Sequence, residues 1–99
     1  MMWRHGDVMI AQVKEVPQNA RRLPQAILAH GEVTGHSHRV EDPKSVAMWQ
    51  SGGEMFMTVL ADHAAISHQE HKRIEVPRGT YRVWQQREYT PRAIVRVSD

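Results

Sequence analysis

The sequence predicts an all-β fold, a single small antiparallel β-barrel or sandwich formed by one domain over residues 1–99. Short runs rich in Val, Ile and aromatic residues, about seven in all, are separated by Gly, Pro and Asp turn residues at intervals of roughly ten residues. No stretch of the chain shows a helical period. A chain of this length can bury one hydrophobic core but leaves little stability to spare, so we expect a homo-oligomer.

The first half of the chain predicts two strands. Residues 8–13 form the first one, entered through a turn at Gly6-Asp7. Residues 16–25 contain two prolines and predict a connecting loop, with a short helical turn between the prolines as an option. The second strand covers residues 26–40, with Gly31 and Gly35 as positions that suit a bulge.

The second half predicts two hairpins. Asp42-Pro43 is a turn signal, and residues 46–50 and 54–60 pair across Gly52-Gly53, where glycine supplies the positive φ of a tight turn. Residues 74–76 and 81–85 pair across a turn at Pro77-Arg78-Gly79. Tyr81 and Val83 then share one face of their strand and Trp84 lies on the other. This strand continues to Tyr89, Thr90-Pro91 ends it, and residues 93–97 form the last strand.

Composition and charge limit the possible functions. The chain has no Cys, which excludes a disulfide framework and a thiolate metal site. Lys and Arg number 13 against 11 Asp and Glu, and the net charge of +2 is compatible with nucleic acid without indicating it. No apolar run approaches the ~18 residues of a membrane span or forms a signal peptide. We therefore expect a cytoplasmic protein with no membrane partner.

Histidine is the most informative residue type, with seven copies in 99 residues. His36 and His38 are one residue apart on an expected strand, so their imidazoles project from the same face. His68 and His71 provide a second pair further along the chain. Neutral imidazole is a common ligand of divalent transition metals. We predict that His36, His38, His68 and His71 bind one such ion, zinc or nickel first, with copper, iron or manganese as further candidates.

Alternatives to this site remain open. His36 and His38 are also compatible with polar strand residues that face water, and the second pair with an unrelated loop. In an unbroken strand His71 would point outward, so only a turn at residues 68–71 would let it join His68. A catalytic metal would also need an acid or a base nearby, and the candidates are Glu32, Glu41 and Glu70.

Part of the chain resembles the cupin type of metal-binding β-barrel. The matching residues are Gly31 or Gly35, His36, His38 and, at a shorter spacing than usual, Glu41. Pro77-Arg78-Gly79 is similar to the Pro-x-Gly turn of that family. The resemblance implies a barrel with a histidine metal site. The chain departs from the pattern because cupins place their last His after that turn, whereas His68 and His71 precede it.

Three classes of function follow. The first is a metal-binding β-barrel, with a structural or a catalytic role and with enzymatic activity left open. The second is a structural or protein-interaction module that forms a homo-oligomer without metal. The third and least favoured is a basic nucleic-acid-binding barrel that uses an arginine series with aromatic residues between its members. Those residues are Arg78, Arg82, Arg87, Arg92 and Arg96 with Tyr81, Trp84 and Tyr89.

Overall fold

The computed structural model describes residues 1–30, 35–89 and 94–96. Its described part consists of β-strands and one short 3₁₀ helix. The strands are β1 (Met2–His5), β2 (Val8–Gln12), β3 (Arg21–Leu23), β4 (Ile27–His30), β5 (Ser37–Val40), β6 (Val46–Ser51), β7 (Glu54–Ser67), β8 (Ile74–Gln85), β9 (Arg87–Tyr89) and β10 (Ile94–Arg96). The helix η1 (Pro43–Ser45) lies in the turn expected at Asp42-Pro43. The all-β prediction is confirmed.

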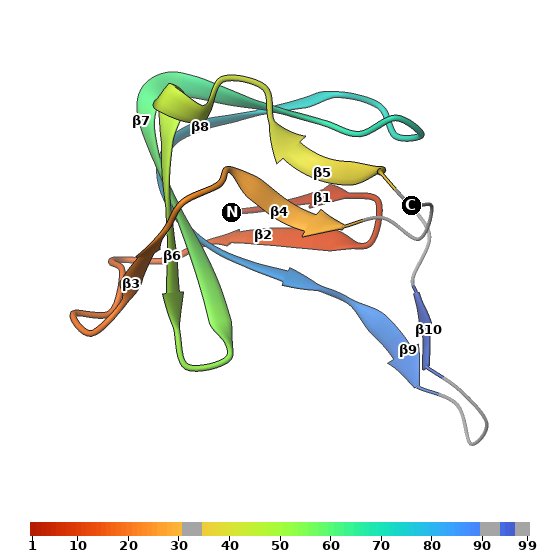
Figure 1. The fold of residues 1–99 in the computed structure, drawn as a ribbon, viewed down its shortest axis with the longest axis horizontal. Coiled ribbons are helices and arrows are strands. Elements are labelled where there is room, and N and C mark those ends of the chain that lie inside the picture. The colour runs from red at the N-terminus through yellow and green to blue at the C-terminus, as the bar shows by residue number, and fades with distance from the viewer. Residues whose placement is uncertain (31–34, 90–93, 97–99) are drawn as a thin grey trace.

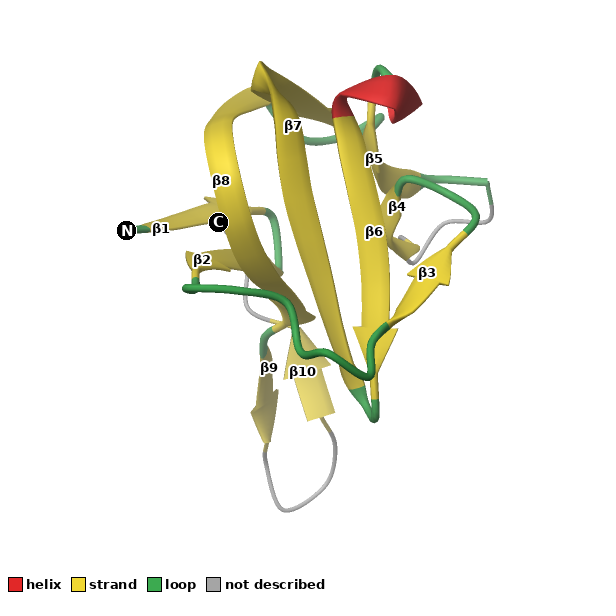
Figure 2. Cartoon of the chain, turned by 90° about the vertical axis from the view of Figure 1, so that its left-hand side faces the viewer, coloured by secondary structure: helices red, strands yellow, loops and turns green. Residues whose placement is uncertain are grey.

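Eight of the strands form one antiparallel sheet in the order β1-β2-β8-β7-β5-β4, with β6 also pairing β7 and β3 pairing β6. The long strand β7 belongs to both halves of the sheet. Its first part lies between β6 and β8, and its last residues pair with β5 (Figures 1 and 2). Within the described residues the sheet does not close on itself, so of the two expected alternatives, barrel and sandwich, the fold matches the sandwich-like one.

The hairpin of β6 and β7 is confirmed. Its register pairs Met48 with Met57 and Ser51 with Glu54, and the turn places Gly52 at φ +59°. Met48 and Met57 are partners in this register, and both are buried in the core. The main cluster also contains Val8, Ile10, Leu28, Val40, Val46, Val59, Ala64, Ile66, Val76, Tyr81 and Val83.

The predicted hairpin at Pro77-Arg78-Gly79 is wrong, because β8 runs through these residues without turning back. Pro77 lies opposite His63, where the pairing of β7 with β8 shifts register. The other neighbour, β2, pairs only with residues 81–85 of β8. A residue without a backbone N–H is tolerated at such a place because little of the hydrogen-bond ladder depends on it. The expected separation of Tyr81 and Val83 from Trp84 is nevertheless observed, since the first two are buried and Trp84 is half-buried.

The single strand expected over residues 26–40 is also wrong. Strands β4 and β5 are antiparallel partners, with Ala29 opposite His38 and His30 opposite Ser37. Gly35 has a φ of +86°, in the left-handed region that glycine adopts without strain. Residues 31–34, including Glu32, lie outside the described residues. The reversal places His36 and His38 at the start of β5.

The N-terminal strand β1 was not expected. It pairs with β2 through a turn at Gly6-Asp7, so this turn connects two strands. The expected loop over residues 16–25 contains the short strand β3. Strands β9 and β10 form a separate two-stranded sheet beyond β8 (Figure 2). The expected break at Thr90-Pro91 lies outside the described residues. Among the described residues, no helix has the length and apolar character needed to cross a membrane.

Candidate metal centre

Three segments that are distant in sequence meet at one end of the sheet. The β1–β2 turn contributes His5, Gly6 and Asp7, and the start of β5 contributes His36 and His38. The connection between β7 and β8 contributes residues 68–71. Contacts between imidazole rings join all three segments. The ring centroid of His38 lies 4.9 Å from that of His5, 4.4 Å from that of His68 and 5.3 Å from that of His71. The result is a cluster of five histidines.

His38, His68 and His71 form the part of this cluster that could hold a metal ion. Each offers a ring nitrogen, and the three nitrogens lie within 4.8 Å of one another. Nitrogens that bind one tetrahedral zinc lie about 3.3 Å apart, because the Zn–N bond is about 2.05 Å long. Modest rotations of the rings would close this difference, so the donor set fits a transition metal.

The fourth predicted ligand, His36, does not belong to this triad. It forms a second group with His68 and Glu70, whose ligand atoms also lie within 4.8 Å of one another. The Nδ1 atom of His36 is 3.8 Å from Oε2 of Glu70. The four predicted histidines therefore form two overlapping groups that share His68. Residues 68–71 lie outside β7 and β8, so His71 is able to converge with His68. This agrees with the alternative in which residues 68–71 do not continue the strand.

Burial favours the neutral form of two residues of the triad, His38 and His68. His38 is 1% exposed, and burial, followed by the charges of His5 and His68, lowers its pKa to about 4; Asp7 opposes this shift without overcoming it. Burial and then the charge of His71 lower the pKa of His68. Both imidazoles are therefore neutral near pH 7, and the neutral form is the one that binds metal.

Two buried residues that the sequence did not point to complete the surroundings of His38. The Nδ1 atoms of His5 and His38 are 2.8 Å apart, and Oδ1 of Asp7 lies 3.5 Å from Nε2 of His38. The backbone N–H of Gln86 and the side-chain amide of Gln85 both donate to Asp7. His5 ends an unexpected strand and Asp7 resembled a simple turn residue. Only the abundance of histidine could have drawn attention to His5.

Gly6 forms one wall of the centre. Its φ is +63°, and a Cβ atom built there would lie 2.9 Å from Cε1 of His38 and 2.9 Å from Nε2 of His71. Contacts this short do not occur for real Cβ atoms, so the backbone of the β1–β2 turn approaches the two rings as closely as glycine allows.

One family model matches residues 4–86 of the chain, and its description is "Domain of unknown function (DUF8820)". The chain belongs to this family. Every residue of the histidine cluster lies inside the matched range. Comparisons with curated proteins and with solved structures give no match. The resemblance to cupins is thus not supported by the family match, and the expected Pro-x-Gly turn lies inside β8.

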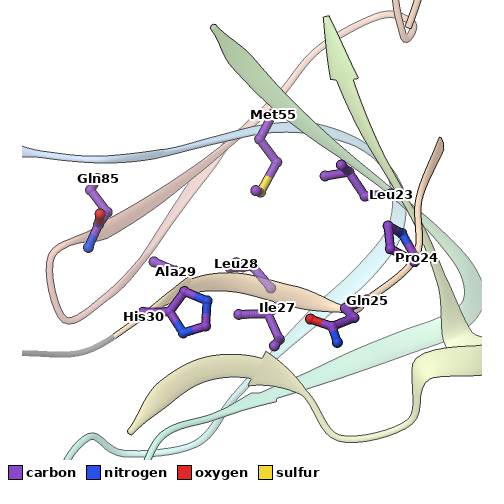
Figure 3. Close-up of a pocket in the computed structure, with 9 residues that line it drawn as sticks. All are labelled: Leu23, Pro24, Gln25, Ile27, Leu28, Ala29, His30, Met55 and Gln85. Carbon is purple, nitrogen blue, oxygen red and sulfur yellow. The ribbon is translucent and has the colours of Figure 1, made fainter. Parts of the chain in front are cut away.

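A cavity of about 480 Å³ lies between β4 and the ends of β7 and β8 (Figure 3). Its walls are mostly apolar, with three polar side chains among the lining residues Leu23, Pro24, Gln25, Ile27, Leu28, Ala29, His30, Met55 and Gln85. The volume is in the range of small-molecule sites. Gln85 lies between the cavity and Asp7, because its amide donates to the Asp7 carboxylate at 3.2 Å; His38, His68 and His71 do not line this cavity. A smaller cavity of about 230 Å³ has His68 among its lining residues.

Among the described residues, Glu41, His30 and His63 lie outside the centre. Glu41 forms a 3.0 Å ion pair with Arg73, and the charge-assisted bonds raise the pKa of that guanidinium. His30 and His63 are exposed, and neither belongs to the cluster of five.

Proposed function

We propose that this protein binds one divalent transition metal ion through His38, His68 and His71. The observation that carries the proposal is the convergence of three ring nitrogens within 4.8 Å from segments some thirty residues apart. The lowered pKa values of His38 and His68 support it, because both side chains are ready to bind without losing a proton at neutral pH. Zinc or nickel is the proposed ion, since a set of imidazoles without thiolates favours a metal of intermediate softness.

The Nε2 atom of His68 adds a second line of support. It is buried and has no hydrogen-bond partner among the described residues. A buried polar atom without a partner costs about 1–3 kcal/mol of stability, and such atoms call for an explanation by a missing ligand or ion.

The test uses the full chain purified without a polyhistidine tag. Elemental analysis should find about one metal ion per chain. At a free ion concentration of ~100 times Kd, binding to the folded state alone stabilises it by ~2.7 kcal/mol, which raises Tm by roughly 10–20 °C. His68→Ala and His71→Ala should abolish this rise. His63→Ala is the matched control, because His63 is exposed and distant from the cluster.

Circular dichroism shows whether each variant is folded before metal is added. Melting temperatures that agree within about 2 °C in chelator and in zinc, nickel, copper, iron and manganese would contradict the proposal.

A catalytic role for the ion is favoured over a closed structural one by two features. Three protein ligands leave a coordination position open, as catalytic zinc sites do. The cavity of about 480 Å³ lies near the centre, since its lining residue Gln85 donates to Asp7, and its apolar walls suit a small organic molecule. Cobalt-loaded protein should then change its visible spectrum when azide is added, because azide occupies an open position. An unchanged spectrum would indicate a closed site.

Nucleic-acid binding has less support. Arg82 lies over the ring of Trp84 and pairs with Glu54 at 2.7 Å, and Arg78 pairs with Asp62 at 3.1 Å. Two members of the arginine series are thus neutralised by carboxylates, whereas phosphate recognition needs unpaired cations.

A further inference from the structure

The two ligand groups that share His68 differ in their access to solvent. His38, in the inner triad, is 1% exposed. In the outer group, the side chains of His36 and Glu70 are 27% and 58% exposed. We propose that the outer group, His36, Glu70 and His68, is a second metal position through which a divalent transition metal ion enters and leaves the inner triad. This inference rests on the proposed function of the triad.

The geometry of the outer group suits a first binding step. The rings of His36 and His68 are 5.7 Å apart and perpendicular, so their edges can face a common point. The Nδ1 atom of His36 is buried and has no hydrogen-bond partner within the part of the chain that the structure describes. Glu70 adds a carboxylate, which attracts a hydrated cation and exchanges ligands readily. Two nitrogens and one carboxylate oxygen are a donor set that can hold a divalent transition metal ion.

His68 cannot serve both positions at once. A neutral imidazole has one lone pair available for a metal and carries its proton on the other nitrogen. An ion held by His68 in the outer group must therefore move inward before a second ion can follow. The inner and outer positions exclude each other, and we expect one ion per chain at saturation.

Metal binding at His68 competes with a hydrogen bond inside the loop of residues 68–71. The backbone N–H of Glu70 donates to Nδ1 of His68 at 2.9 Å. If a metal binds Nε2, the ring proton moves to Nδ1, and two donors then face each other. If the metal binds Nδ1, it occupies the lone pair that accepts the hydrogen bond from Glu70. In both cases the hydrogen bond from the Glu70 backbone N–H to Nδ1 of His68 breaks, so metal binding at His68 releases Glu70 from this ring.

A position on the entry route changes rates without changing affinity. Such an intermediate accelerates uptake and release by the same factor, because Kd depends only on the free and the final bound states. Ligands of the final site behave differently, since their loss weakens affinity mainly through faster release. This contrast separates the two roles.

The experiment follows Co²⁺ uptake by stopped-flow absorbance and Co²⁺ release into excess EDTA, with Kd from competition titration. The variants are His36→Ala and Glu70→Gln. The controls are His63→Ala and Asp62→Asn, which remove an exposed imidazole and an exposed carboxylate far from the cluster. Each test variant should slow uptake and release at least fivefold and change Kd less than twofold. Neither control should change the rates.

Three results would overturn the inference. Unchanged rates in both variants would show that the outer group is not on the route. A weaker Kd with faster release would make His36 and Glu70 ligands of the final site. Two Co²⁺ ions bound together per chain would show that the positions do not exclude each other. A wild-type chain that binds no Co²⁺ would instead refute the triad itself, so the two failures are distinguishable.

Discussion

Replacing Gly6 by alanine tests whether the β1–β2 turn forms a wall of the metal centre. The substitution has two costs. An L-residue in the left-handed region loses about 1–2 kcal/mol, and Gly6 has a φ of +63°. The new Cβ would also lie 2.9 Å from atoms of both His38 and His71, so these rings must move, and overpacking of this kind costs typically 1–3 kcal/mol.

Gly52 provides a matched control. Its φ is +59°, nearly that of Gly6, but a Cβ built there meets nothing within 4 Å. Gly52→Ala therefore has only the backbone cost, about 1–2 kcal/mol, whereas Gly6→Ala has that cost and the displacement of two imidazoles. Because 1 kcal/mol corresponds to about 4–8 °C in a domain of this size, Gly6→Ala should melt several degrees below Gly52→Ala in chelator.

The decisive comparison is the rise of Tm on addition of zinc or nickel, measured by differential scanning fluorimetry. Gly52→Ala should keep the rise of the wild-type chain, and Gly6→Ala should lose most of it, because its rings are moved out of place. Equal rises in the two variants would refute the reasoning, whatever their absolute stabilities, since the contact with the rings would then have no effect on binding.

Three further predictions concern pH, the core and self-association. In chelator, the free energy of unfolding should fall by up to about 3 kcal/mol as the pH drops from 6.5 to 4, because His38 takes up a proton in the unfolded chain while its lowered pKa keeps it neutral in the folded chain. In urea unfolding, the free energy of unfolding of His38→Asn should depend less steeply on pH. Tyr81→Phe should cost about 1–2 kcal/mol in urea unfolding, because the buried hydroxyl donates to the Pro77 carbonyl at 2.6 Å, and no change would mean that water replaces it. We expect a homo-oligomer with Trp84, half-buried under Arg82, at its interface, so Trp84→Ala should lower the sedimentation coefficient if it stays folded; a wild-type monomer would contradict this expectation.

Local patterns in the sequence predicted the parts of the fold that depend on neighbouring residues. The turn at Gly52-Gly53 and the separation of Tyr81 and Val83 from Trp84 in β8 are confirmed. Pro77-Arg78-Gly79 has the composition of a turn, but long-range pairing of β8 with β7 overrides it. Local chemistry cannot reveal that a neighbouring strand has shifted register and leaves room for a proline.

In the site, too, features set by neighbouring residues were easier to predict than features set by long-range strand pairing. The prediction that His68 and His71 converge with His38 rested on the shared strand face of His36 and His38 and on the closeness in sequence of His68 and His71. The inclusion of His5 depends on the three-dimensional course of the sheet, because β1 and β5 are not neighbours in the strand order and His5 nevertheless contacts His38. The exclusion of His36 from the triad depends on where β5 begins. No spacing rule contains this information.

The connection between β7 and β8 affects how tightly an ion could be held. It covers only residues 68–73, and the two longest strands fix its ends, because they pair up to Ile66 and Ile74. His68 and His71 therefore stay near each other without an ion, so once one has bound, the other is present at a high effective concentration. Little conformational entropy remains to be lost when the shell closes. The pairing of β7 with β8, outside the site, thus reduces the entropy cost of binding and so strengthens the affinity for the ion.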